Sequence, residues 1–241
     1  MSTREINVSP HQYLNQTQLE RQFIMHIFTY QPPSIPWLDI RYKDRDIIVI
    51  NKPSGLLSNP GRSPDTHDTA ITRLQRCYPE AILIHRLDCD TSGIMIFART
   101  KKAESHLKIQ FQNRQAKKVY IAEVIGHVGE QQGKVNFALG PNPDSPPFQM
   151  LTDSGKAALT YFSVLEHRAY STLMELKPHT GRTHQLRVHM LALGHAILGD
   201  EFYGDESTIN ASKRLNLHAQ SLTITHPYSQ IEMTFFSQHP F

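Results

Sequence analysis

A short polar segment in the middle of the chain holds the side chains best suited to chemistry. Residues 85–93 read His-Arg-Leu-Asp-Cys-Asp-Thr-Ser-Gly, with apolar runs before them (82–84) and after them (94–98). A carboxylate between two buried strands is costly to bury unless a partner compensates its charge. Asp88 is therefore a candidate catalytic residue. The structural alternative is that Asp88 and Asp90 only build an Asx-type turn.

Such a carboxylate suits reactions at the anomeric carbon of a sugar, where it can stabilise or trap a developing oxocarbenium ion. Hydrolysis by two carboxylates would need Asp90 as the second group, whereas one carboxylate paired with a cation fits a transferase or an isomerase better. Arg182 and Arg187 are the candidate cations. Because they are five residues apart, on a helix they would face different directions, so that one could reach Asp88 and the other a phosphate.

Two nucleophilic arrangements are less favoured. Cys89 has His85 four residues away, but on an extended segment that spacing gives the histidine no defined direction, so Cys89 is expected to fill space. Ser92 lacks the glycine two residues to each side that a nucleophile elbow requires, and it fits a turn better.

Four histidines follow one another closely enough to suggest a metal site, at positions 179, 184, 189 and 195. Zinc pairs on a helix are spaced by three or four residues, because those positions share a face. A spacing of five turns the second side chain about 140° away from the first. We therefore expect these histidines to cap, pack and hydrogen-bond, and we predict no metal.

The patterns around these residues predict an α+β fold. Its central sheet is expected to be mixed and mostly antiparallel, because the connections are short, with flanking helices and loops. Helices are expected at 69–78, at 183–193 and at 101–114, the last with Ala103, Leu107, Ile109 and Phe111 facing inward. The remaining expectations are strands at 38–42, 47–50, 94–98, 117–124, 158–166, 171–177, 217–224 and 232–236, short strands near 134–139 and after Gly155, and a surface loop at 205–214.

Length and composition indicate one catalytic domain, residues 37–241, preceded by an extension and linker, residues 1–36. The 241 residues include two cysteines and carry a net charge of +3, and the sequence has neither a signal-peptide pattern nor an 18-residue apolar run. These features predict a cytoplasmic location. Residues 99–118 carry many basic side chains and a single acidic one, Glu104, which suggests a surface that contacts phosphates.

Five segments, in order, resemble the motifs of the RluA-type pseudouridine synthases, and together they span residues 38–236. They are Asn-Lys-Pro-Ser-Gly-Leu at 51–56, the segment 85–93, Lys-Lys-x-Tyr at 117–120, Gly-Arg-Thr-His-Gln-Leu-Arg-Val-His at 181–189 and Leu-Gly-Asp-x-x-Tyr-Gly at 198–204. The resemblance is strongest to the short members that lack an N-terminal S4 domain, for which this chain has no room.

The resemblance implies a pseudouridine synthase fold and the isomerisation of uridine to pseudouridine in RNA, without cofactor or metal. Asp88 matches the essential aspartate, which acts either as nucleophile at C1′ or as the base that removes the 2′ proton. Arg187 matches the arginine that pairs with it. Tyr120 matches the residue that stacks on the base and moves the C5 proton, Arg86 the side chain that replaces the flipped nucleotide, and Leu186 a residue of the uracil pocket.

His85, Arg182 and Lys118 are further expected substrate contacts, and the basic segment 99–118 is assigned to phosphates. The implied partners are RNA stem-loops, in the anticodon arm of tRNA, in 23S rRNA or in both; no protein partner or membrane is implied, and a monomer is expected. Two alternatives stay open: a noncatalytic RNA-binding protein, and a glycosidase or nucleoside hydrolase that uses Asp88 and Asp90.

Overall fold

The computed structural model describes residues 30–241, so the predicted extension lies almost entirely outside the described residues. The described chain forms two compact units. One comprises Gln31–Ala122 together with Arg214–Phe241, and the other comprises Glu123–Lys213. We call them the loop unit and the arginine unit, after the predicted site residues that each contains. In the described part of the chain, no helix has both the length and the apolar character needed to cross a membrane.

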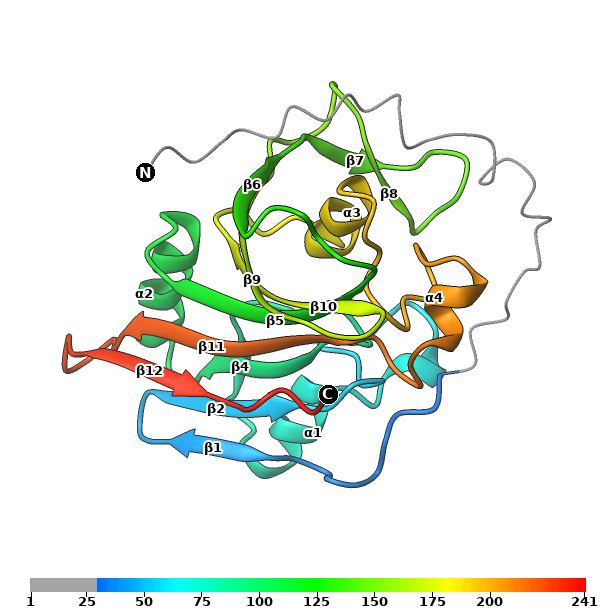
Figure 1. Ribbon diagram of the computed structural model, residues 1–241. Coiled ribbons are helices and arrows are strands. Elements are labelled where there is room, and N and C mark those ends of the chain that lie inside the picture. The colour runs from blue at the N-terminus through cyan, green and yellow to red at the C-terminus, as the bar shows by residue number, and fades with distance from the viewer. Residues whose placement is uncertain (1–29) are drawn as a thin grey trace. The chain divides into compact units, whose positions relative to one another are not determined.

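The loop unit is built on a sheet in which neighbouring strands are antiparallel, with one exception (Figure 1). The exception is the pair β4–β11, which is parallel and joins His218 to Ser92 and Ala219 to Gly93. The strands, in order across the sheet, are β1 (Ile40–Lys43), β2 (Ile47–Lys52), β4 (Ser92–Ala98), β11 (Leu217–Thr225) and β5 (Lys117–Ile125), with β12 (Glu232–Phe236) paired to β11 and β3 (Ile82–Leu83) to β4.

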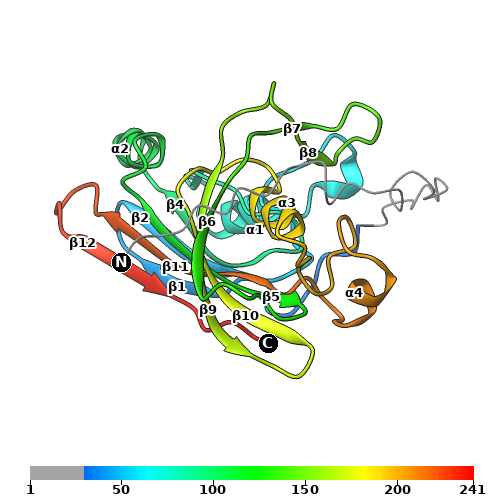
Figure 2. The ribbon, with the colours of Figure 1, turned by 45° about the horizontal axis from the view of Figure 1, so that its top comes forward.

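Two helices cover opposite faces of this sheet (Figure 2), which explains why β2 and β4 are apolar at consecutive positions. On β2, Ile47 belongs to the core under α2 (Lys101–Gln112), whereas its neighbour Ile48 belongs to the core under α1 (Ala70–Cys77). Thr69 begins α1 with a capping box, and Thr100 caps α2 by accepting from the backbone N–H of Ala103.

The arginine unit contains an antiparallel meander and two helices (Figure 1). Its elements are β6 (Gln132–Asn136), β9 (Leu159–His167) and β10 (Ser171–Pro178), the separate pair β7 (Leu139–Pro141) and β8 (Gln149–Leu151), and the helices α3 (Gln185–Ala192) and α4 (Glu206–Asn210). With the loop unit, these elements confirm the predicted α+β fold with a mostly antiparallel sheet.

Three local predictions were wrong. Ile109 is 51% exposed and Gln110 is buried in its place, where its amide bonds the backbone of Thr225. Residues 205–214 contain α4, whose N-cap Asp205 accepts from the N–H of Thr208, and not only loop. After Gly155 an isolated bridge replaces the predicted short strand.

Candidate active site

Asp88 lies in the segment 84–91, which links β3 to β4 without regular structure. Leu87 is buried in the core under α1, which anchors the segment. Its neighbours are accessible: Arg86 is exposed, and Asp88 is half-buried. Asp88 is thus less buried than the apolar runs around it suggest, and a reactant can reach a side chain at this position.

The segment 52–58 holds the backbone on both sides of Asp88. The Ser58 hydroxyl donates to the carbonyl of Leu87 (2.6 Å) and accepts from the Leu87 N–H (3.0 Å). The Ser54 hydroxyl donates to the carbonyl of Asp90 (2.6 Å). These bonds immobilise the residues that flank Asp88, as a preorganised site requires.

Lys52 links the segment 52–58 to the segment that contains Asp88. Its buried ammonium donates to the carbonyls of Pro53 (2.8 Å), Leu56 (2.6 Å) and Cys89 (2.8 Å), and the N–H of Gly55 also donates to Cys89 (3.0 Å). Burial lowers the pKa of Lys52 to about 7, against the opposing effect of the acidic groups of the loop. Burial raises the pKa of the Cys89 thiol to about 12, which does not favour a nucleophilic thiolate.

Tyr120 lies on β5, opposite Ala219 of β11. Burial raises the pKa of the phenol above its ordinary value, and the negative charge of Asp88 raises it further. The phenol therefore keeps its proton at neutral pH. The loop unit thus combines a carboxylate with a neutral aromatic hydroxyl, which can serve respectively as an anionic group at a sugar and as a proton carrier.

His85 and Lys118 have surroundings that limit what they can do. The Nε2 of His85 accepts from the N–H of Ile96 (3.1 Å), and its ring stacks on Phe111 with the ring centroids 4.7 Å apart. Burial lowers the pKa of His85 to about 3 and also lowers the pKa of Lys118. His85 is therefore neutral and supports β4; the substrate contacts expected of both residues stay predictions.

Arg187 lies on α3 in the arginine unit and is buried. It forms a two-pronged ion pair with Asp200, in which Nε and Nη2 lie 2.8 and 2.6 Å from the two carboxylate oxygens. The guanidinium also lies over the rings of Phe202 and Tyr203, 4.7 and 5.2 Å from their centroids. The guanidinium is therefore oriented within its own unit, while its predicted pairing with Asp88 stays a prediction.

Gln185 orders the turn that begins α3. Its Oε1 accepts from the Thr180 hydroxyl (2.7 Å) and the Arg182 N–H (3.0 Å), and its Nε2 donates to the hydroxyl of Thr160 on β9 (3.0 Å). Arg182 is exposed and Leu186 is buried. Their predicted contacts, to a phosphate and to uracil, stay predictions.

Three histidines of the predicted series form hydrogen bonds within the arginine unit. His184 is the N-cap of α3, in a left-handed conformation (φ 53°), with Nδ1 2.7 Å from the Tyr203 hydroxyl. His189 is buried with Nδ1 2.9 Å from the Thr160 hydroxyl, and burial lowers its pKa to about 4. His195 places Nδ1 2.8 Å from the carbonyl of Ile125. Each of these rings is held by a different partner.

Within the described residues, the group whose geometry could suit a metal ion is Asp44, Asp46 and His226. The Asp44 carboxylate already accepts from the Tyr42 hydroxyl (2.9 Å), the Asp46 N–H (2.8 Å) and His226 Nε2 (2.8 Å). These bonds fit a side chain that orders the turn between β1 and β2. They do not fit a ligand with open positions.

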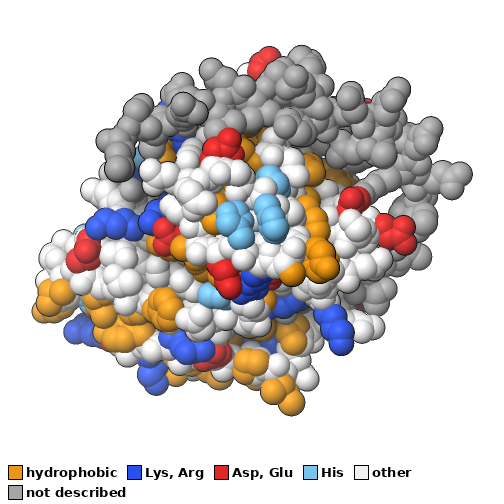
Figure 3. Space-filling model, in the orientation of Figure 1, with side chains coloured by type: hydrophobic (Ala, Val, Ile, Leu, Met, Phe, Trp, Pro, Cys, Tyr) orange, Lys and Arg blue, Asp and Glu red, His pale blue; other side chains and the backbone are white. Residues whose placement is uncertain are grey.

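Basic side chains are interspersed with acidic and hydrophobic ones on the face drawn in Figure 3. On α2, the carboxylate of Glu104 binds both Lys101 (3.0 Å) and Lys108 (2.6 Å). The assignment of residues 99–118 to RNA phosphates stays a prediction.

Sequence reasoning missed Lys52, Ser58, Gln185 and Asp200 as supports of the site. All but Ser58 lie inside the quoted motifs, so a signal was present for those three. Their more distant partners, such as Cys89 for Lys52 and Leu87 for Ser58, could not be identified, because these contacts join segments that are far apart in the sequence.

Comparisons with known proteins identify the family of this chain. The family model for RNA pseudouridylate synthase matches residues 46–192. The dual-specificity RNA pseudouridine synthases RluA of Salmonella typhi and Escherichia coli (strain K12) are each 50% identical over 213 residues, covering 88% of this chain and 97% of the relative. The solved structure of Human RNA Pseudouridylate Synthase Domain Containing 1 has a TM-score of 0.74 at 32% identity, covering 88% of this chain and 87% of that one.

The family match and the fold together identify the chain as an RNA-modifying isomerase. The chain belongs to the RNA pseudouridylate synthase family, which confirms the resemblance seen in its motifs, and its curated relatives named here are RluA enzymes.

Proposed function

We propose that this enzyme converts uridine to pseudouridine in two kinds of RNA, the anticodon stem-loop of tRNA and a stem-loop of 23S rRNA. The observation that carries the proposal is the near-complete match to the dual-specificity RluA enzymes, which covers 97% of their length at 50% identity. A monomeric state and a cytoplasmic location stay predictions.

In the proposed reaction the target nucleotide is flipped out of the stem-loop, because a stacked base hides C1′ and its own edge. Exposed Arg86 enters the vacated place. Asp88 acts at the ribose, either by attacking C1′ or by removing the 2′ proton. The uracil detaches, turns over and rejoins the sugar through C5, and Tyr120 moves the C5 proton. Arg187 is the residue that pairs with Asp88 in the proposed reaction.

Support for these roles comes from the chemical state of each group. Asp88 is accessible on a backbone fixed by hydrogen bonds on both sides. Tyr120 is a neutral phenol within the electrostatic influence of Asp88, so it moves the C5 proton in a relay, receiving that proton at its oxygen as it gives up its own. Arg187 is held in one orientation by the two oxygens of Asp200, so that its charge is fixed in place.

The test is modification of defined RNAs by the purified enzyme. Two transcripts are incubated with it separately, a tRNA anticodon stem-loop and the 23S rRNA stem-loop, and pseudouridine is mapped by chemical derivatisation and primer extension. We expect one modified position in each. Modification of a single RNA kind would reject the dual range and keep the activity, whereas modification of neither would reject the proposal.

A further inference from the structure

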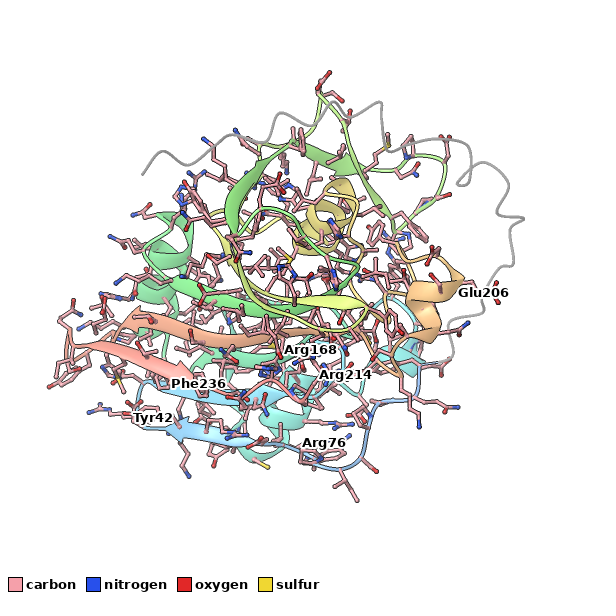
Figure 4. The ribbon with its side chains drawn as sticks, viewed as in Figure 1. Tyr42, Arg76, Arg168, Glu206, Arg214 and Phe236 are labelled. Carbon is pink, nitrogen blue, oxygen red and sulfur yellow. The ribbon has the colours of Figure 1, made fainter. Side chains whose placement is uncertain are left out.

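The segment 84–91, which we call the catalytic segment, is joined at its C-terminal end to β11 through side chains that the proposed reaction does not use. Ser92, the first residue of β4, has its hydroxyl 2.6 Å from Nη2 of Arg214 and 2.7 Å from Nδ1 of His218. His218 places Nε2 3.0 Å from the carbonyl of Ser237, directly after β12. Ser92, His218 and Ser237 are buried, and Arg214, labelled in Figure 4, precedes β11.

The direction of every hydrogen bond in this series can be assigned. A carbonyl only accepts, so His218 Nε2 carries the proton that is donated to Ser237. Burial lowers the pKa of His218 to about 4, although the bond to Ser237 opposes this, so the ring is neutral and Nδ1 accepts. The Ser92 hydroxyl therefore donates to His218 and accepts from Arg214.

The backbone beneath this series is closely packed. Gly93 has φ +119°, and a Cβ built there would lie 2.3 Å from the carbonyl oxygen of Ala219. β4 and β11 therefore approach too closely for a side chain at this position, in the short parallel pair that aligns Ser92 with His218. A displacement of Arg214 or His218 would consequently be passed on to Ser92 and to the segment before it.

Arg214 is the member of this hydrogen-bonded series that interacts electrostatically with the catalytic segment. Burial lowers the pKa of Arg214, and the negative charge of Asp90 partly opposes this shift. Asp90 is half-buried, and its carbonyl is held by Ser54. Arg214 thus binds Ser92, directly after the segment, and lies within the electrostatic influence of Asp90, near the end of the segment.

We propose that Arg214, Ser92 and His218 form a positioning chain that fixes the C-terminal end of the catalytic segment, so that Asp88 stays aligned with the ribose. The inference rests on the proposed function of Asp88. It assigns no chemical step to the three residues: each acts through the backbone of the segment, and Asp88 alone touches the reacting sugar.

Ser92→Ala tests the central residue of the positioning chain, because the change removes the hydroxyl and adds no bulk. A misalignment of about 1 Å can reduce turnover about 100-fold. We expect the single-turnover rate at saturating RNA to fall about 10- to 100-fold, with the Kd for RNA unchanged. Thr223→Ala is the matched control, since it removes a hydroxyl bonded between β11 and β12 (2.8 Å to Thr234) away from the segment; its rate should equal that of the wild type.

Two substitutions of His218 distinguish its hydrogen bond to Ser92 from its hydrogen bond to Ser237. In His218→Asn the amide oxygen can replace Nδ1 as acceptor for Ser92, whereas in His218→Gln the amide nitrogen can replace Nε2 as donor to Ser237. The proposal predicts that the Asn variant turns over faster than the Gln variant at equal stability, measured by urea unfolding. A purely structural role for His218 would make turnover follow stability, and that result would overturn the proposal.

Arg214→Lys completes the test in combination with Ser92→Ala. Once the hydroxyl is absent, the second change should add little to the loss of rate, because contacting residues of one network are not additive. Fully additive losses, or a wild-type rate in Ser92→Ala, would reject the positioning chain. If the wild-type enzyme itself forms no pseudouridine, the proposed function fails first, so the two failures are distinguishable.

Discussion

Lys52 offers the most demanding prediction about how the site is held together. Its ammonium donates to three carbonyls at 2.6–2.8 Å with no exposed surface. Hydrogen bonds from a charged donor contribute about 1.5–3 kcal/mol each. The burial of the charge offsets part of their sum. Lys52→Met removes the charge itself and takes the ammonium donor from three carbonyls, and a buried acceptor left unsatisfied costs about 1–3 kcal/mol. We expect Lys52→Met to lower the free energy of unfolding by about 3 kcal/mol.

The assay can use the single tryptophan of the chain, Trp37, which lies in the loop unit over the guanidinium of Arg73 (4.3 Å). Urea titrations followed by its fluorescence report unfolding of the unit that contains Lys52. Lys102→Met is the matched control, because Lys102 is exposed on α2. The control should change the free energy by less than about 0.5 kcal/mol.

The pH dependence provides a second check on Lys52. Its pKa is about 7 in the folded chain and 10.5 ordinarily, so between these values the unfolded chain binds a proton that the folded chain does not. The contribution of Lys52 to stability therefore rises with pH across this window. The gap between the wild type and Lys52→Met should widen above pH 7. A gap below about 0.5 kcal/mol, or one that narrows as pH rises, would refute the reasoning.

Three further predictions concern the other groups of the site. Tyr120→Phe should reduce turnover by about 100-fold or more, as expected when a proton carrier is lost, in a tritium-release assay with unchanged RNA affinity. Arg187→Lys loses one prong of the pair with Asp200 and should reduce both thermal stability and turnover; an unaltered melting temperature would contradict this. In the folded chain the pKa is about 3 for His85 and about 4 for His189, against an ordinary value of 6.5. Between pH 4 and pH 6.5 the folded chain therefore binds fewer protons than the unfolded chain. Urea titrations should therefore show stability falling as pH drops from 6.5 towards 4.

The sequence predicts the helices and strands of this fold well where hydrophobic periodicity is strong. The prediction of which side chain is buried fails where a single polar residue finds a hydrogen-bond partner in the core. The consecutive apolar residues of β2 and β4 required a sheet covered on both faces, and α1 and α2 provide the covers. Ile109 was assigned to the wrong face because an apolar residue was preferred over helical geometry. Position 110 follows Leu107 by three, and Gln110 is buried there because Thr225 satisfies its amide.

In the site, the catalytic candidates could be predicted from the sequence, whereas the partners that hold them could not. Asp88 and Tyr120 could be selected from their motifs, and the structure adds that the phenol is neutral beside the carboxylate. The support could not be predicted: Lys52 binds the carbonyl of Cys89, 37 residues away in the sequence, and a backbone carbonyl leaves no trace in the residue type. Likewise, nothing local marks Asp200 as the partner of Arg187.

The central claim is that the carboxylate of Asp88 performs the isomerisation. Asp88→Asn keeps the shape of the side chain and removes its charge. The direct measurement is pseudouridine formation by this variant in a single turnover, together with its Kd for the same stem-loop RNA. The account predicts that no pseudouridine forms while RNA is still bound with wild-type affinity. Pseudouridine formation at the wild-type rate would contradict it.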